Sequence, residues 1–318
     1  METIVKKTDR ESSFELLRII AMLMIIGHHY YNKGGLAIFA GTSVTNKYAI
    51  LFLGQGGKAA VILLVLITGY FCVRKDCKPY NLLKTECAMQ FCGVVFFAIA
   101  CLTGAETFKL STLVKNLFPF MFARYWFMTV YILMFLLLPF INKGLLMLGK
   151  QDHRRLLLFS CSMLYVTPLL NRLAFRKMET EYSQLVWSPL LWFLTVYLIG
   201  AYVGRFFREK QKGVNPTRRL LLGIALYGAG VLIEVFTDLY IQNAEISSFV
   251  YALLFSEESP LILVSMVLIF LFFKDHHLGA RRWINGIAQG VMGVYLIHEN
   301  EYMRGWIWGV VYRYEGFQ

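Results

Sequence analysis

Charged residues are scarce in this chain, at 16% of its 318 residues, whereas 57% of the residues are hydrophobic. Soluble globular proteins carry about 25% charged and about 45–50% apolar residues. The scarcity excludes an ordinary soluble domain. Apolar runs recur from one end of the sequence to the other, and they predict a polytopic integral membrane protein.

Acidic residues are the scarcer charged class, with 20 Asp and Glu against 32 Lys and Arg, which leaves a net charge of +12. An excess of this size first suggests a nucleic-acid partner. The basic residues, however, gather in short loops between apolar runs, which is typical of topology signals that face the cytoplasm. We therefore expect membrane lipid, and no nucleic acid, among the partners.

Motifs of several protein classes are also lacking. The six cysteines include no CxxC pair and lie in or beside apolar runs, so we interpret them as reduced packing residues and expect no disulfide framework and no metal. The first apolar run has no small-residue cleavage site and is followed by further runs, which argues against a secretory signal. Without a repeat, Pro-rich linker or low-complexity tract, residues 1–318 are predicted to form one membrane domain.

A membrane span needs about 20 mostly apolar residues. The candidate runs are 14–31, 59–73, 87–103, 125–141, 155–173, 188–207, 219–241, 259–273 and 284–298. An aromatic-rich stretch follows at 300–314. The sequence therefore predicts an all-α transmembrane helical bundle of about 9–10 spans.

The loops between these runs alternate in positive charge. Lys and Arg are frequent at the N-terminus and in loops 74–86, 142–154, 208–218 and 274–283, and less frequent in loops 32–58, 104–124 and 242–258. Because positive loops stay in the cytoplasm, the N-terminus is predicted to be cytoplasmic. An odd number of spans leaves the C-terminus outside, and insertion of the 300–314 stretch would return it inside.

The first run carries ionisable residues at both ends, with Arg18 near its start and His28 and His29 near its end. Ionisable residues in a membrane segment are candidate functional residues. Eleven steps of about 100° return a helix to within roughly 20° of its starting direction, so Arg18, Met22, Ile25 and His29 form one stripe about 16 Å long. The alternative is that both ends lie near headgroups and snorkel.

Two histidines from opposite ends of the chain are predicted to share a depth. At a rise of ~1.5 Å per residue, His29 lies roughly 22 Å from the inner face and His298 roughly 21 Å. Arg124 and Trp126 lie at the start of the fourth predicted span, near the same depth as the two histidines. The alternative for His298 is an ordinary histidine at the membrane interface, and the alternative for Arg124 and Trp126 is an interfacial aromatic belt.

Other polar residues fall elsewhere in the runs. Arg18, Tyr70 and Arg74 are predicted to cluster near the inner face. Pro260 would break a helix, so the acidic pair at 257–258 is expected in a loop or in a broken helix that lines a cavity.

Together these segments resemble acyltransferase family 3, whose membrane proteins O-acylate surface polysaccharides. ESSFELLRIIAMLMIIGHHYY resembles the opening segment of the family, with Arg18 and His29 separated by ten residues. LVLITGYF, RYWFMTVYILMFLLLPFIN and VMGVYLIHENEYMRGWIW resemble its later motifs in the same order. The similarity runs from about residue 11 to residue 312.

The resemblance implies an O-acyltransferase in a bacterial plasma membrane, with cytoplasmic acyl-CoA, most often acetyl-CoA, as donor and a glycan hydroxyl outside as acceptor. It suggests that Arg18 holds a donor phosphate or carbonyl oxygen, because a guanidinium binds phosphate bidentately. His29 would act as a general base or as a transient acyl carrier. His298 or Glu299 would orient His29 or the acceptor.

Further residues are assigned to the paths of the two substrates. Tyr70, Arg74 and Lys75 are expected to contact the donor, and Arg124 and Trp126 to line the acceptor path. The Arg74-Lys75 pair stands where the family often has Arg-x-Arg, which weakens the donor assignment there. Members usually carry a further apolar segment after the His block, so we expect this chain to be shortened at its C-terminus.

Two other functions fit the same residues. A transporter or exporter of a glycan or lipid-linked intermediate would also use intramembrane Arg and His and a Pro-broken segment, although transporters often show internal repeats. An inactive, shortened paralogue with a structural role is the other alternative. Acceptor-dependent release of CoA separates the enzyme from both, and the sequence gives no indication of oligomeric state.

Overall fold

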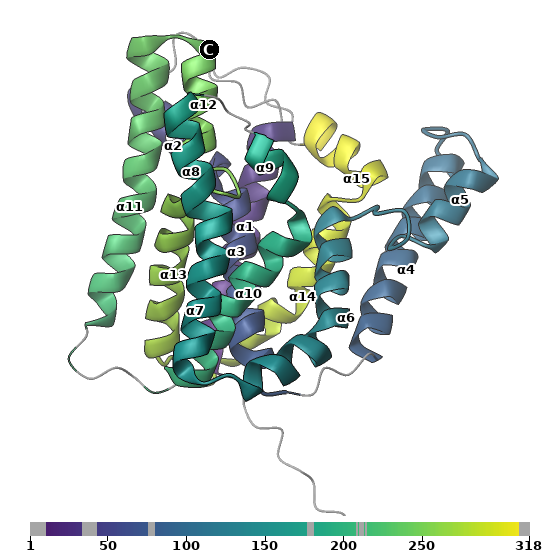
Figure 1. The fold of residues 1–318 in the computed structure, drawn as a ribbon. Helices are drawn as coiled ribbons and strands as arrows, with labels where there is room; N and C mark the ends of the chain where they lie inside the picture. Colours follow the sequence, from purple (N-terminus) through teal and green to yellow (C-terminus); the bar gives the residue numbers. More distant parts are fainter. Residues whose placement is uncertain are drawn as a thin grey trace, which may run out of the picture.

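The computed structural model describes residues 11–33, 43–75, 80–176, 181–207, 209, 213 and 215–311. Over these residues it is a helical bundle without a strand (Figure 1). The α-helices are α1 Ser12–Lys33, α2 Val44–Gly54, α3 Gly56–Cys72, α4 Tyr80–Leu102, α5 Leu110–Leu117, α6 Trp126–Met147, α7 Lys150–Cys161, α8 Thr167–Phe175, α9 Glu181–Val186, α10 Pro189–Phe206, α11 Pro216–Phe236, α12 Ala244–Leu254, α13 Pro260–Asp275, α14 Arg282–His298 and α15 Glu301–Trp306. Single π-helical turns are η1 Ser162–Val166, η2 Thr237–Ile241 and η3 Ile307–Val311.

All nine predicted runs are helical, so the prediction of an all-α multi-span bundle is confirmed. Six segments are long and apolar enough to cross a membrane, namely Val44–Cys72, Leu82–Leu102, Trp126–Met147, Lys150–Phe175, Pro189–Phe206 and Pro216–Ile241. The other three predicted runs are not among these six. Helix α1 carries an acid, an arginine and two histidines, and α13 and α14 are shorter, with 16 and 17 residues. Some of the basic residues behind the predicted orientation lie outside the described residues, namely Lys6, Lys7, Arg10, Lys78, Arg208, Lys210 and Lys212.

The expectation of a loop over 32–58 is wrong in its second half. The Ser43 side chain accepts a hydrogen bond from the Asn46 backbone N–H at 3.2 Å and caps α2, and only Gln55 separates α2 from α3. Lys47 and the glycines around Gln55 gave this segment the composition of a loop. Short helices α5, α9 and α12 likewise lie in predicted loops, because packing on the bundle stabilises segments whose own helical preference is weak.

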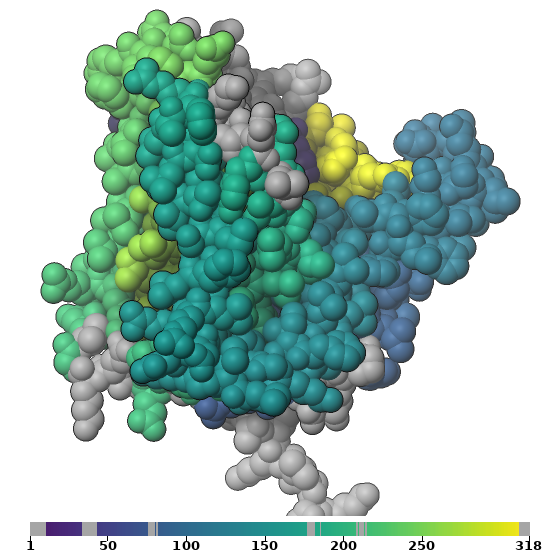
Figure 2. All heavy atoms as spheres, viewed as in Figure 1, coloured from purple at the N-terminus to yellow at the C-terminus, as the bar shows by residue number. Residues whose placement is uncertain are grey.

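Helix α3 lies at the centre of the bundle. The apolar window of Val44–Cys72 is 72% buried, against 22% for that of Leu82–Leu102 on the periphery, where α4 and α5 stand out from the rest of the molecule (Figures 1 and 2). Contact between α3 and α10 depends on glycines. A Cβ at Gly69 would collide with the carbonyl oxygen of Tyr197, and Cβ atoms at Gly200 and Gly204 would collide with carbonyl oxygens of α3. Small residues allow two membrane helices to pack backbone to backbone.

Hydrogen bonds join the start of α1 to the loop between α13 and α14. The Ser12 backbone N–H donates to the Gly279 carbonyl at 3.0 Å, and the Arg281 N–H donates to Ser12 Oγ at 2.7 Å. Glu11 accepts from the Leu278 N–H at 2.9 Å. Burial raises the pKa of Glu11, but this bond and those from Ser13 outweigh burial and leave the pKa lowered. Helices α1 and α14 therefore start at one level and run in parallel.

Helix α13 runs in the opposite direction to α1. Its C-terminal end lies at the start of α1, where the Ser13 hydroxyl donates to the carbonyl of His276. Its N-terminal end, which begins with Pro260 in the first turn, therefore lies at the level where α1 and α14 finish. The acidic pair Glu257–Glu258 precedes Pro260 in a turn, which confirms the expectation of a loop for this pair. Pro260 itself is the first residue of α13 and breaks no helix, because the first turn of a helix tolerates a proline.

Candidate active site

The structure brings His29 and His298 into contact, in agreement with the common depth predicted for them. The Nε2 atom of His298 lies 3.0 Å from Nδ1 of His29. His29 lies seventeen positions after Ser12, and His298 lies seventeen positions after Arg281. Since Ser12 and Arg281 are hydrogen-bonded, two parallel helices of equal rise meet again at the histidines, roughly 25 Å further along. We call this level the histidine end of the bundle.

The next residue after His298 adds a carboxylate to the pair. Glu299 caps α14, and its Oε1 lies 3.1 Å from Nδ1 of His29. The same Oε1 accepts from the ammonium group of Lys33, one helical turn beyond His29 on α1. The Glu299 side chain is 8% exposed, so a lysine neutralises a carboxylate that solvent hardly reaches.

Hydrogen bonds determine which nitrogen of His29 carries its proton. Nδ1 of His298 lies 2.6 Å from the carbonyl oxygen of Val294, which can only accept, so this nitrogen donates. In the neutral ring, Nε2 of His298 then holds a lone pair and accepts from Nδ1–H of His29, as Glu299 does. The lone pair of His29 is consequently on Nε2, and this nitrogen is the one able to take a proton.

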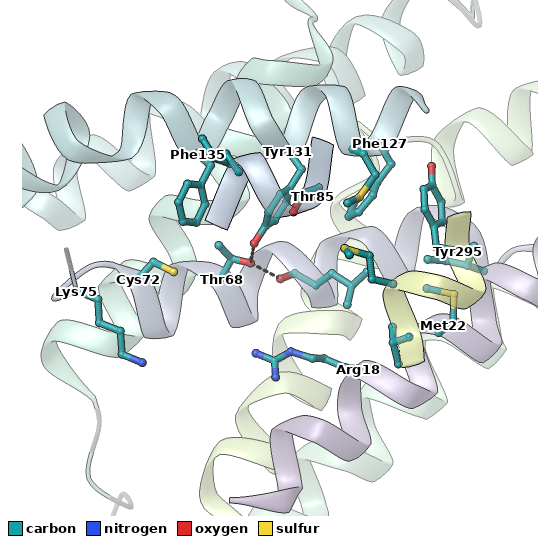
Figure 3. A pocket seen from close by; sticks show the side chains of 16 residues that line it. Arg18, Met22, Thr68, Cys72, Lys75, Thr85, Phe127, Tyr131, Phe135 and Tyr295 are labelled. Carbon is teal, nitrogen blue, oxygen red and sulfur yellow. Dashed lines mark hydrogen bonds between the residues drawn. The ribbon is translucent and has the colours of Figure 1, made fainter. Parts of the chain in front are cut away.

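A cavity of about 510 Å³ lies along the predicted stripe of α1. Arg18, Met22 and Ile25 all line it, and His29 follows one turn later on the same face. Figure 3 shows Cys72 and Lys75 at one end of the cavity, Phe127 and Tyr295 toward the other, and Arg18 on the wall that α1 provides. The remaining lining residues are Leu64, Thr68, Leu82, Thr85, Met128, Tyr131, Phe135, Val291 and Met292.

Charge and polarity are unevenly distributed along this cavity. Arg18 and Lys75 provide its cationic groups, and Nη1 of Arg18 donates to Glu15 at 2.5 Å. In the middle of the wall, Thr68 Oγ1 donates to the carbonyl of Leu64 at 2.9 Å and lies 3.2 Å from the hydroxyl of Tyr131 (Figure 3). Methionine and aromatic side chains cover most of the remainder. The cavity thus suits an extended molecule that is anionic at one end and less polar along its length.

Two residues assigned to the donor do not line this cavity. Tyr70 is buried and stacks on Phe14, with ring centroids 5.1 Å apart. Arg74 is exposed and donates from Nη2 to the carbonyl of Arg205 at 2.8 Å. Lys75, the neighbour of Arg74, is the cation that reaches the cavity wall.

The two residues assigned to the acceptor path lie in separate contacts. Arg124 forms an ion pair with Glu301 and lies 3.4 Å from the hydroxyl of Tyr302, beside α15. Trp126 begins α6 and is 40% exposed, with the ammonium of Lys58 5.1 Å from its ring centroid. Neither makes a described contact with the histidines.

The histidine cluster has a spacing that a metal ion can use. Ligand atoms of His29, His298 and Glu299 lie within 4.8 Å of one another. The ammonium of Lys33, however, already contacts the carboxylate oxygen that would bind a cation. A positive charge at this position opposes metal binding, which agrees with the expectation of a metal-free site. That expectation stays a prediction.

Sequence reasoning missed two neighbours of the histidines. Lys33 lies four residues after His29, and Tyr295 lies three residues before His298, so helical spacing places each on the face of its histidine. The Tyr295 ring lies edge-on to His298 with centroids 5.8 Å apart, and Tyr295 also lines the cavity. Periodicity places both residues on the faces of the histidines, but the contact of Lys33 with Glu299 depends on how α1 and α14 pack.

One family model matches the chain, over residues 11–317, and its description is an acyltransferase domain. No curated protein matches the chain. No solved structure matches it either.

Proposed function

The chain belongs to the acyltransferase domain family, and from that premise we propose that it transfers an acyl group from acyl-CoA to a hydroxyl group of a glycan. The observation that carries the proposal is the alignment of two sites on one face of α1. Arg18, Met22 and Ile25 line a cavity of about 510 Å³, and His29 lies one turn beyond.

The donor fits the cavity by charge and shape. Acyl-CoA is anionic at its nucleotide end, and its pantetheine arm is long and less polar. Arg18 and Lys75 would bind phosphate oxygens at the first end, because guanidinium and ammonium groups form charge-assisted hydrogen bonds with phosphate. The thioester would then lie toward Tyr295 and the histidines. The stripe from Arg18 to His29 spans about 16 Å, which is on the order of an extended pantetheine arm.

His29 would serve as the general base. Its Nε2 lone pair takes the proton of the acceptor hydroxyl while the hydroxyl oxygen attacks the thioester carbonyl carbon. The C–S bond then breaks, an ester forms, and His29 returns the proton to the departing thiolate of CoA. Glu299, 3.1 Å from Nδ1 of His29, stabilises the imidazolium that forms between the two proton transfers.

The acceptor would approach from the histidine end. The predicted orientation has the start of α1 in the cytoplasm, so the histidine end faces outward and Arg18 lies on the side that holds acyl-CoA. This division fits an enzyme of the plasma membrane of a bacterium that modifies a surface or lipid-linked glycan. Acetyl-CoA is the donor that we expect.

The test is acyl transfer by membranes that contain the His29→Ala variant. We expect acceptor-dependent CoA release to fall by at least about 100-fold, the lower range for loss of a general base. The matched control is His277→Ala, because the His277 side chain is a 67% exposed loop histidine. Wild-type transfer by His29→Ala at matched expression would refute the assignment of the base. Absence of acceptor-dependent release from the wild type would refute the enzyme and leave the transporter and the inactive paralogue.

A further inference from the structure

A second cavity, of about 260 Å³, lies among α8, α9 and the turn before α13. Its lining residues are Arg172, Ser183, Gln184, Trp187, Glu257 and Glu258. Because α13 is antiparallel to α1, the turn before Pro260 lies at the histidine end of the bundle. The cavity is therefore on the side from which the acceptor would approach.

The charges in the wall of this cavity are balanced. Arg172 forms an ion pair with Glu258, and its Nη1 also donates to the carbonyl of Ala252 at 2.9 Å. Glu257 forms an ion pair with Lys58. Lys58 does not line the cavity, but once this partner of Glu257 is included, two carboxylates and two cations leave no net charge. An anion such as a phosphate would find no unbalanced positive group here, and a cation no unbalanced negative one.

Uncharged, hydroxyl-rich ligands fit the remaining groups. The indole of Trp187 offers an apolar face for the C–H face of a ring. The Glu257 side chain is 23% exposed, and a carboxylate can accept hydrogen bonds from hydroxyls beside its ion pair with Lys58. Gln184 is exposed in the same wall, and an amide can both donate and accept. The volume is just below the range of about 300–1,000 Å³ typical of drug-sized ligands, so it suits one sugar ring.

Contacts lead from this cavity to the histidines. Lys58, the partner of Glu257, follows Gly57 at the start of α3. A Cβ at Gly57 would meet the ring of His28 at 2.5 Å, so the backbone of α3 lies directly against the residue that precedes His29. The ammonium of Lys58 also lies over the ring of Trp126, which the sequence assigned to the acceptor path.

We propose that this second cavity binds a neutral pyranose unit of the acceptor glycan. The inference rests on the proposed function, because it names the class of acceptor that the histidine site would acylate. It also gives Trp126 a place in the acceptor path, beside Lys58, the partner of Glu257 in the wall of the pyranose subsite. The ion pair of Arg172 and Glu258 holds α8 to the turn before α13 and so shapes the cavity wall.

The experiment measures binding of methyl pyranosides to the full-length protein in detergent by saturation-transfer NMR. The panel contains methyl glycosides of neutral hexoses and of N-acetylhexosamines. We expect at least one to bind saturably, and Trp187→Ala to weaken its binding by about 2- to 10-fold, the range for loss of an aromatic contact. Trp187→Phe should retain most of the affinity. The matched control is Trp283→Ala, because Trp283 is 65% exposed at the opposite end of the bundle.

Kinetics separate this inference from the proposed function. In transfer assays, Trp187→Ala should raise the KM for the pyranoside and leave the KM for acyl-CoA as it is. His29→Ala should lower transfer by at least about 100-fold without changing pyranoside binding. If no pyranoside binds the wild type, or if Trp187→Ala and Trp283→Ala behave alike, the pyranose subsite is refuted. If binding depends on Trp187 but no acyl group is ever transferred, the proposed enzymatic function fails and the subsite stands.

Discussion

Replacement of Glu299 by glutamine tests the proton chemistry most directly. Glutamine keeps an oxygen that can accept from Nδ1–H of His29, so the neutral imidazole retains its orientation. The imidazolium that forms after proton uptake loses its carboxylate, 3.1 Å away. A hydrogen bond to a charged group contributes about 1.5–3 kcal/mol, so kcat should fall by about 10- to 150-fold.

The assay for Glu299→Gln is acceptor-dependent CoA release from purified protein at saturating acyl-CoA. The KM for acyl-CoA should not change, because Glu299 does not line the donor cavity. Lys33→Gln is the informative comparison, since it removes the other partner of Glu299 and leaves the carboxylate beside His29. Glu106→Gln, in an exposed loop, controls for the loss of one acidic residue.

Two results would refute the reasoning about Glu299. An unchanged kcat in Glu299→Gln would mean that the carboxylate does not stabilise a charged His29. An equal loss in Lys33→Gln would mean that the ion pair holds the local structure together and that the carboxylate has no part in proton transfer.

Two further predictions concern the donor and the helix packing. Arg18→Gln should raise the KM for acyl-CoA by about 10- to 150-fold, because it removes one charge-assisted contact with a phosphate. Turnover of acetyl-pantetheine should not change, because that donor lacks the nucleotide phosphates. An equal effect on both donors would place Arg18 at the thioester carbonyl. Gly69→Ala should destabilise the protein by about 1–3 kcal/mol, because the new Cβ collides with the carbonyl oxygen of Tyr197. Thermal unfolding in detergent measures the loss of stability. The matched control is Gly144→Ala, where a Cβ meets nothing within 4 Å.

Helix geometry is regular, so the sequence alone could predict which residues of the first run share a face and which residue of another helix lies at their level. The spacing of Arg18, Met22 and Ile25 predicted one face, and that face lines a cavity. Rise per residue likewise predicted the meeting of His29 and His298, because both helices start at one level and cross the same thickness.

Residues outside such regular segments could not be placed in the same way. Tyr70 belongs to a motif of the family, but the rotation of α3 turns its ring onto Phe14 and away from the cavity. Arg74 and Lys75 are adjacent in sequence, and the end of α3 directs one to the backbone of Arg205 and the other to the cavity. The direction of a side chain after a helix end depends on the packing around it, which spacing does not describe.

The sequence by itself determined that this is an all-helical membrane protein and which face of its first helix carries the polar residues, because apolar length and helical period are properties of local sequence. Only the tertiary structure decided how the helices combine. The position of Lys33 at Glu299, and the second cavity around Trp187, depend on contacts between segments that lie far apart in the chain. Such contacts follow from the packing of helix surfaces, and the period of no single helix specifies them.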